Sequence, residues 1–179
     1  MRIVVLSAER GAGKTTACLR LVDLAREAGL AVGGIAAPAR YDTGGAKTGI
    51  DVIDVAGGER RALAEIEPDP TRATVGEYRF HPEAEAWALG ILLTSLDRPL
   101  DLVIVDEIGP LELFQGRGYA PVLERLSSAR CRSAVIPVRA PLAEALADRL
   151  RALAPVTIPL TLANRDDVPA QLLQKITGG

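Results

Sequence analysis

The sequence predicts an α/β protein with a mainly parallel sheet covered by helices on both faces. Short β-branched runs alternate along the chain with helical stretches rich in Ala and Leu, which is typical of strands joined by helical crossovers. The 179 residues are 48% hydrophobic, which suits the core of one domain. Aromatic residues make up only 3%, so the core must be built from Ala, Val, Ile and Leu, as in sheets buried on both faces.

Short apolar runs predict a five-stranded core sheet, because each run has the length and composition of an interior strand. These runs are residues 2–7, 31–36, 100–106, 133–138 and 156–160. The predicted helices are residues 14–28, 82–96, 120–129, 141–153 and about 165–176. Gly29 suits the end of the first helix, and Asn164 suits the N-cap of the last.

Residues 47–66 interrupt the alternation and predict an inserted antiparallel β-hairpin at an edge or face of the sheet. Apolar residues on both sides flank a Gly57-Gly58 turn within this stretch. A Pro-Asp-Pro stretch at residues 68–70 then breaks regular structure before the next helix. Since no linker or repeat follows, residues 1–179 are predicted to form a single domain.

Charge and composition exclude several classes of protein. The 21 Lys and Arg residues are balanced by 23 Asp and Glu residues, so no basic surface for nucleic acid is expected. The N-terminal apolar run is too short for a signal peptide, and no stretch approaches the ~20 apolar residues of a membrane span. Cys18 and Cys131 make neither a disulfide framework nor a metal-like pair. We therefore expect a cytoplasmic protein without a membrane partner.

A phosphate-binding loop is predicted between the first strand and the first helix. Backbone N–H groups of such a loop point inward, and the helix N-terminus adds partial positive charge. Lys14 can reach the β- and γ-phosphates, and the Thr15 hydroxyl can ligate Mg²⁺. The residues expected to bind nucleotide here are Ala8, Glu9, Arg10, Gly11, Ala12, Gly13, Lys14, Thr15 and Thr16.

The loop departs from the G-x-x-x-x-G-K-S/T pattern at its first position, which is Ala8. If that residue had to adopt positive φ, alanine would cost roughly 1–2 kcal/mol. We expect alanine to be tolerated there. A dinucleotide-binding fingerprint fits less well, because Thr16 would occupy the position of its third glycine and Lys14 would have no role.

Asp106 and Glu107 end the apolar run 100–106, at a strand end where open α/β sheets place ligands. Asp106 can hold Mg²⁺ there, and Glu107 can orient and polarise a water for attack on the γ-phosphate. Two acids at the end of a strand often only cap and solvate it. Together with the phosphate-binding loop, they favour hydrolysis over simple binding, with Glu107 and Lys14 as the candidate catalytic residues.

The chain resembles the THEP-type nucleoside-triphosphatases of the P-loop superfamily. The resemblance covers nearly the whole chain, and Asp-Glu-Ile-Gly-Pro is much more specific than the phosphate loop. It is carried by Gly-Lys-Thr-Thr at residues 13–16, Thr-Gly-Ile-Asp-Val-Ile-Asp at 48–54, Val-Asp-Glu-Ile-Gly-Pro-Leu-Glu-Leu at 105–113 and Asn-Arg-Asp at 164–166.

The resemblance implies a three-layer α/β/α P-loop NTPase fold, in which one strand separates the strand of Asp106 from the strand of the loop. It also implies slow, Mg²⁺-dependent hydrolysis of several nucleoside triphosphates. Two places depart from the family pattern. Ala8 replaces a glycine, and Ile-Ala-Ala-Pro at residues 35–38 lacks the aromatic and acidic residues expected after the second strand.

Other residues carry weaker hypotheses. His81, the single histidine, is expected to cap a helix, and Trp87 is expected to pack rather than stack on a base. Asn164 and Arg165 follow the last strand and are candidate contacts to the nucleotide base. Arginines able to neutralise transition-state charge are Arg117, Arg139 and Arg165, none of which the sequence singles out as an arginine finger.

Three classes of function remain open on these grounds. The leading one is Mg²⁺-dependent hydrolysis of ATP, GTP and other nucleoside triphosphates to the diphosphate and phosphate. Base specificity should be broad, because the loop contacts only phosphates. A nucleotide or small-molecule kinase would need an acceptor pocket and an arginine-bearing lid, for which residues 116–132 are the candidate. A nucleotide-dependent switch would need a protein partner surface.

Overall fold

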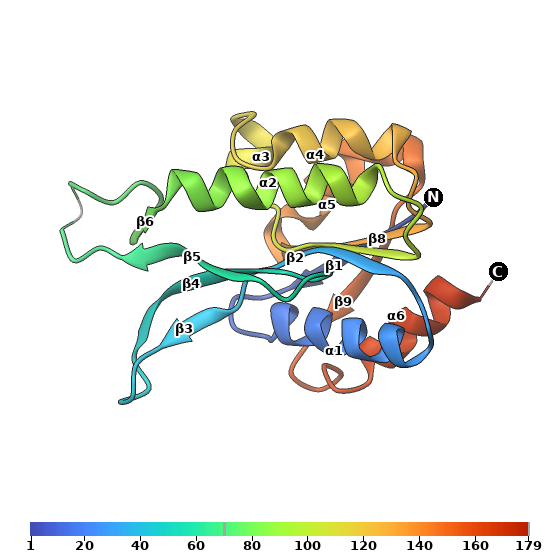
Figure 1. Cartoon of the computed structure of the whole chain (residues 1–179), viewed down its shortest axis with the longest axis horizontal. Helices are drawn as coiled ribbons and strands as arrows, with labels where there is room; N and C mark the ends of the chain where they lie inside the picture. The colour runs from blue at the N-terminus through green and yellow to red at the C-terminus, as the bar shows by residue number, and fades with distance from the viewer. Residues whose placement is uncertain (70, 179) are drawn as a thin grey trace.

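Five parallel strands form the main part of the sheet in this computed structural model, which describes residues 1–69 and 71–178 (Figure 1). They match the five predicted runs and confirm the predicted fold class. Every residue of β7 (Leu102–Val105) is buried, as expected for an interior strand. Across the sheet their order is β2 (Val32–Ala36), β7 (Leu102–Val105), β8 (Ser133–Arg139), β1 (Arg2–Ala8) and β9 (Val156–Leu160).

The position of β8 between β1 and β7 determines which residues meet at the functional edge of the sheet. β8 pairs in parallel with both neighbours, and its last residue, Arg139, lies opposite Ala8, the last residue of β1. Because parallel strands end at the same edge, the loop after β1 and the acids after β7 lie near each other. One strand separates the two motifs, as the resemblance implied.

An antiparallel extension continues the sheet beyond β2. It contains the predicted hairpin, β4 (Lys47–Asp54) and β5 (Arg60–Ile66), together with two strands of three residues, β3 (Ala39–Tyr41) and β6 (Tyr78–Phe80). Figure 1 shows these strands projecting past the helices on the side where β1 ends. The insertion is therefore larger than the hairpin that the sequence predicted, and it lies at the sheet edge.

Gly34 lies in β2, the strand at which the sheet changes from parallel to antiparallel pairing. On one side β2 pairs in parallel with β7 from Val32 to Ile35, and on the other it pairs in antiparallel register with β4 at Ile35 and Ala36. Gly34 has φ +94°, and a Cβ there would lie 2.0 Å from the Ile104 carbonyl oxygen. Only glycine allows the two backbones to approach this closely at a positive φ.

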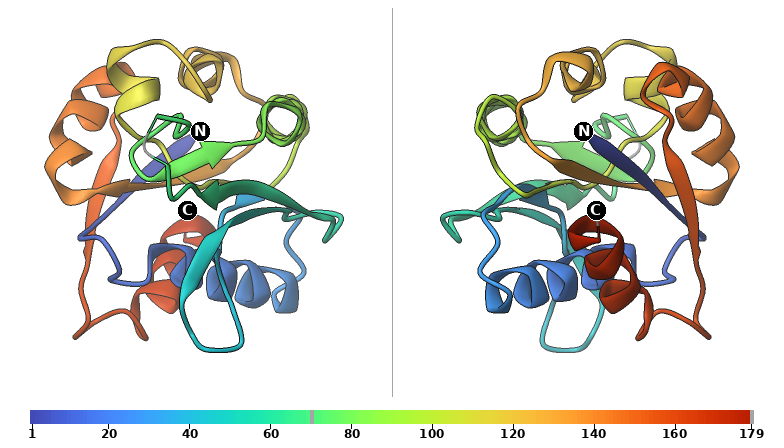
Figure 2. Two further views of the ribbon diagram at one scale, coloured as in Figure 1. Left: turned by 90° about the vertical axis from the view of Figure 1, so that its left-hand side faces the viewer. Right: turned by 90° about the vertical axis from the view of Figure 1, so that its right-hand side faces the viewer.

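Helices cover both faces of the sheet and complete the predicted three layers (Figures 1 and 2). Leu92 and Leu146 are fully buried in the core of one face, and Leu21 and Leu172 in that of the other. The first face carries α2 (Pro82–Leu96), α3 (Pro110–Phe114), α4 (Ala120–Arg125) and α5 (Ala143–Arg149), and the second carries α1 (Lys14–Glu27) and α6 (Val168–Thr177).

Helix boundaries differ from the sequence prediction in the second half of the chain. Predicted helix 120–129 ends as an α-helix at Arg125 and continues as a 3₁₀ turn, and predicted helix 141–153 is an α-helix flanked by 3₁₀ turns. The last helix begins at Val168 with Asp167 as its N-cap, so the prediction that Asn164 caps it is wrong. Gly29 follows the end of α1 with φ +73°, as predicted.

Two further sequence predictions concern chain breaks and membranes. Of the predicted break at residues 68–70, Pro70 lies outside the described residues. Within residues 1–69 and 71–178, no helix has the length and apolar character needed to cross a bilayer.

Candidate active site

The loop between β1 and α1 has the backbone of an anion-binding cradle. Gly11 and Gly13 adopt φ +80° and +98°, conformations that only glycine reaches without strain. Gly13 is the N-cap of α1, and no side chain caps this helix start. The first N–H groups of α1 therefore lack intrahelical acceptors and can bind a phosphate, which the helix dipole also favours.

Ala8 fits this loop because it still belongs to the strand. It pairs with Arg139 of β8 and Leu160 of β9, and it is buried. Its φ is negative, since Ala154 is the one non-glycine residue with positive φ among residues 1–69 and 71–178. Alanine therefore costs no left-handed strain at this first loop position.

Lys14 connects the loop to the acids after β7. Its side chain is only 8% exposed, and Nζ lies 3.5 Å from the carbonyl oxygen of Glu9, to which it donates a hydrogen bond. Nζ also lies 3.7 Å from Oε2 of Glu107. The structure therefore brings together the lysine and the glutamate that the sequence selected as candidate catalytic residues.

Asp106 follows β7 and is almost completely buried, at 1% exposed. The Ala37 N–H donates a hydrogen bond of 3.0 Å to its Oδ2 atom. Burial raises the pKa of Asp106 to about 6, against the lowering effects of the Ala37 N–H and the Thr15 hydroxyl. Ala37 belongs to the 35–38 segment for which the sequence indicated no role, and its main chain now has one.

The oxygens near Asp106 fit a Mg²⁺ ion. Mg²⁺ prefers hard oxygen donors and is commonly held by one or two carboxylates or hydroxyls together with substrate phosphates. The Thr15 hydroxyl lies near the Asp106 carboxylate and lowers its pKa. Both side chains border the anion-binding loop, so protein and phosphate oxygens can share one ion.

Glu107 lies between two positive charges. Its side chain is 32% exposed, so water can reach the carboxylate. Oε2 faces Lys14, and Oε1 lies 3.4 Å from Nε of Arg139 at the end of β8. Of the three arginines considered for charge neutralisation, Arg139 is the one paired with Glu107. Sheet order places it there, because β8 is the direct neighbour of β7.

Glu112 holds the chain that follows Glu107. Its Oε2 accepts a hydrogen bond of 2.8 Å from the Gly109 N–H, and its Oε1 accepts one of 3.2 Å from the Tyr119 N–H. A Cβ at Gly118 would lie 2.2 Å from Oε1 of Glu112, and Gly118 has φ +57°. The carboxylate therefore closes residues 109–119 into a fixed loop beside Glu107.

Arg165 reaches the phosphate-binding loop from the segment between β9 and α6. A Cβ on Gly13 would lie 3.9 Å from its Cδ atom. Asn164 instead supports its own turn, since its Oδ1 accepts the Thr161 N–H at 2.7 Å and its Nδ2 donates to the Pro159 carbonyl at 3.0 Å. A cavity of about 200 Å³ opens at this place, lined by Gly13, Thr16, Ala17, Arg20, Arg165 and Asp166.

His81 and Trp87 contribute to the helix layer over the antiparallel extension. His81 is the N-cap of α2, and its Nε2 approaches Glu65 at 3.9 Å. Trp87 packs against the core, with the Arg61 guanidinium 4.2 Å from its ring centre. Both residues therefore follow the structural roles that the sequence predicted for them.

The predicted arginine-bearing lid is packed onto the body of the protein. Arg125 of α4 pairs with Asp97 at 2.6 Å, and Arg132 pairs with Asp101 at 3.3 Å. Arg117 lies near Glu85, where it opposes the effect of burial, which raises the pKa of that carboxyl.

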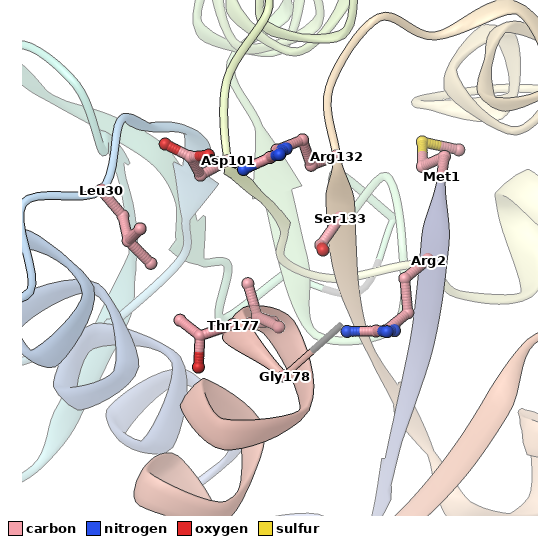
Figure 3. A pocket seen from close by; sticks show the side chains of 9 residues that line it. Met1, Arg2, Leu30, Asp101, Arg132, Ser133, Thr177 and Gly178 are labelled. Carbon is pink, nitrogen blue, oxygen red and sulfur yellow. Dashed lines mark hydrogen bonds and ion pairs between the residues drawn. The ribbon is translucent and has the colours of Figure 1, made fainter.

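A larger cavity, about 510 Å³, lies where the parallel strands begin and contains none of the predicted site residues (Figure 3). Met1, Arg2, Asp101 and Arg132 line it, beside the end of α6 at Thr177. The anion-binding loop therefore lies at the other end of the parallel strands, where open α/β sheets place their ligands.

The fold and the site define a protein of the P-loop nucleoside-triphosphatase class, with a glycine-rich loop after β1 and two acids after β7. The sequence matches the family described as NTPase over residues 3–173, and the chain belongs to that family. Family membership confirms the sequence-based prediction of an enzyme that hydrolyses nucleoside triphosphates.

Curated relatives support the same assignment. The chain is 31% identical to the nucleoside-triphosphatase THEP1 of Methanopyrus kandleri, in an alignment that covers 97% of this chain and 94% of that protein. It is 32% identical to the THEP1 protein of Thermofilum pendens, over 96% and 93% of the two chains.

Solved structures support the fold. The solution structure of a human cancer-related nucleoside triphosphatase superposes with a TM-score of 0.76 at 23% identity, covering 100% of this chain and 99% of the other. The crystal structure of THEP1 from Aquifex aeolicus gives 0.70 at 24% identity, with 99% of each chain covered.

Proposed function

We propose that this chain binds Mg²⁺-nucleoside triphosphates at the β1–α1 loop and hydrolyses them with Glu107 as the general base. One observation carries the proposal: Lys14 of an anion-binding loop lies 3.7 Å from a partly exposed glutamate on the neighbouring motif. A cation for the phosphates and a carboxylate for the water therefore share one site. Residues 1–179 act as a single domain in this proposal.

The phosphates are bound by Lys14 and by backbone N–H groups of the loop that follows Ala8 and of the first turn of α1. The loop needs no rearrangement of glycines to accept them, because Gly11 and Gly13 already adopt positive φ. Lys14 moves its ammonium group from Glu9 and Glu107 to the β- and γ-phosphates. Thr15 and Asp106 hold Mg²⁺, which when bound supplies positive charge that neutralises the phosphate oxygens.

Glu107 orients the attacking water and accepts its proton. The water oxygen forms a bond to the γ-phosphorus while the bond from that phosphorus to the bridging β-phosphate oxygen breaks, giving nucleoside diphosphate and phosphate. Lys14 and the loop N–H groups stabilise the negative charge on the leaving diphosphate. No acceptor other than water is required.

The nucleotide base is placed beside Arg165, at the small cavity along the first turn of α1. The guanidinium of Arg165 can stack on any base. Because the phosphate-binding loop contacts only phosphates, ATP, GTP and other nucleoside triphosphates should all be substrates. Asn164 contributes by fixing the turn that carries Arg165, because its own amide groups are already hydrogen-bonded to the backbone. Broad base specificity follows from so few base contacts.

Replacing Glu107 tests this proposal. Glu107→Gln keeps the size of the side chain but removes the proton acceptor, so phosphate release from ATP and GTP should fall by roughly 10²–10⁴ while nucleotide binding persists. The control is Glu124→Gln, which replaces an exposed glutamate on α4 and should release phosphate at the wild-type rate. Normal phosphate release from Glu107→Gln would refute the assignment. Diphosphate formation that requires an added acceptor would indicate a kinase instead.

A further inference from the structure

Arg139 occupies a position that the two nucleotide-site motifs share. It is the last residue of β8, the strand between β1 and β7, and it lies in register with Ala8 at the start of the phosphate-binding loop. On the other side, the preceding residue Val138 bridges to Ile108, just after Glu107. The backbone of Arg139 is therefore fixed by both neighbouring strands, before any nucleotide binds.

The guanidinium of Arg139 contacts the Glu107 carboxylate directly. Nε lies 3.4 Å from Oε1, while the opposite oxygen of the same carboxylate faces Lys14 at 3.7 Å. Glu107 thus bridges two cations that come from two different strands and loops. The Arg139 side chain is 51% exposed, so its position is determined by this pair more than by packing.

Nucleotide binding changes the two ion pairs differently. The triphosphate attracts the Lys14 ammonium away from Glu107, because its phosphate groups together carry more negative charge than one carboxylate. Arg139 remains paired with Glu107, because it belongs to β8 and not to the phosphate-binding loop. The carboxylate then has one cationic partner, which holds it at the edge of the loop where the γ-phosphate is bound.

We infer that Arg139 is a positioning residue, whose guanidinium orients the Glu107 carboxylate toward the attacking water. This inference rests on the proposed role of Glu107 as the general base. Arg139 acts only through Glu107 and makes no contribution to nucleotide affinity. A general base that is misplaced by about 1 Å can cost a factor of about 10² in rate, so a positioning contact has a measurable effect.

A double-mutant cycle on phosphate release tests the inference. Arg139→Ala should lower kcat by about tenfold to a hundredfold and leave KM within about twofold of wild type. In the Glu107→Gln background, the same substitution should change kcat by less than about twofold, because the carboxylate that it orients is already absent. Arg139→Lys restores a cation without the planar guanidinium and should recover only part of the lost rate.

Two results would overturn the inference. An equal further loss of kcat when Arg139→Ala is added to Glu107→Gln would mean that Arg139 acts on the phosphates and not through Glu107. A raised KM with unchanged kcat would make it a binding residue. Arg132→Ala is the matched control and should leave kcat unchanged. Arg132 lies just before the start of β8, at the opposite end of the strand from Arg139, and its side chain is 80% exposed.

The same data separate this inference from the proposed function. If Glu107→Gln turns over like the wild type, the proposed function itself fails. If Glu107→Gln is impaired and Arg139→Ala is not, only the role of Arg139 is wrong. Thermal unfolding of each variant without nucleotide checks that a lost rate does not reflect a lost fold.

Discussion

Asp106 combines two requirements that oppose each other. A metal ligand must be ionised, yet the side chain is buried under the edge of the sheet, and burial raises its pKa to about 6. The Ala37 N–H and the Thr15 hydroxyl lower the pKa and keep the carboxylate available at neutral pH. The protein without nucleotide therefore carries a buried charge that does not help it fold.

We expect Asp106→Asn to stabilise the nucleotide-free protein at pH 7.5. Because burial raises the folded-state pKa of Asp106 to about 6, above its ordinary value of 3.8, the folded protein binds more protons between these pH values and its stability falls as pH rises. The neutral amide avoids this loss, which is worth about 3 kcal/mol at pH 7.5. Chemical unfolding at pH 7.5 and below pH 4 measures the gain, which should vanish at the lower pH.

The same substitution should weaken the metal site. Asparagine keeps one oxygen but loses the negative charge, so Asp106→Asn should need a higher Mg²⁺ concentration for half-maximal phosphate release. A variant that is more stable and less active would match a functional charge placed in a destabilising position. An unchanged Mg²⁺ dependence would remove Asp106 from the metal site, and an equal gain at both pH values would mean that the stabilisation is unrelated to its charge.

At the residue scale, the sequence predicted the residues that form motifs but not those that support them. Lys14, Thr15, Asp106 and Glu107 stand in short patterns whose residue types suit the chemistry. Arg139 was one of several equivalent arginines, and the Ala37 N–H has no side-chain signal at all. Ala37 follows β2 and Arg139 ends β8, and these two strands are the neighbours of β7. The contacts of Ala37 and Arg139 with the acids after β7 therefore depend on sheet order, which a local sequence pattern does not contain.

At the scale of elements, long apolar patterns were predicted well and short pieces were not. Helix α2 was predicted with its observed bounds, Pro82–Leu96, because it is long and begins with Pro. Strands β3 and β6 have three residues each, too few to show a period of two, and they form only by pairing with β4 and β5. The hairpin was therefore predicted without the two strands that flank it.

Residues 109–119 form the loop that follows Glu107 in the chain, and the Glu112 side chain holds the two ends of this loop together. We expect Glu112→Ala to destabilise the protein by about 1–2 kcal/mol, because the Gly109 and Tyr119 N–H groups both lose a charged acceptor. This corresponds to a fall of about 2–8 °C in Tm for a chain of this size. Limited proteolysis should also cut faster within residues 109–119.

Two comparisons make this prediction specific. Glu112→Gln retains one carbonyl oxygen and should lose less stability than Glu112→Ala, since only one of the two N–H groups then lacks its acceptor. Glu124→Ala on α4 removes an exposed glutamate and should leave Tm within about 1 °C, as surface substitutions usually do. If Glu112→Ala were equally stable, the loop would be held by its glycines and apolar contacts alone.

At the scale of the whole molecule, the phosphate-binding loop connects several parts of the fold. Arg10 of the loop pairs with Glu77, just before β6, at 2.8 Å, and Arg20 of α1 pairs with Asp166 before α6. These pairs are exposed, and exposed pairs contribute only about 0–1 kcal/mol each. A ligand that binds the loop therefore adds links between β1, α1 and the acids after β7 that weak surface pairs do not supply.

A nucleotide should consequently raise the stability of the entire fold through Lys14. A non-hydrolysable nucleoside triphosphate with Mg²⁺, at about 100 times its dissociation constant, adds about 2.7 kcal/mol to the free energy of unfolding. For a domain of this size, the increase in Tm is roughly 5–10 °C. Lys14→Ala should lose most of this increase, because the ammonium group that contacts the β- and γ-phosphates is absent. Lys175→Ala, at an exposed position of α6, is the control and should keep it. If the Lys14→Ala protein showed the full increase at the same nucleotide concentrations, the nucleotide would bind at a place other than the β1–α1 loop.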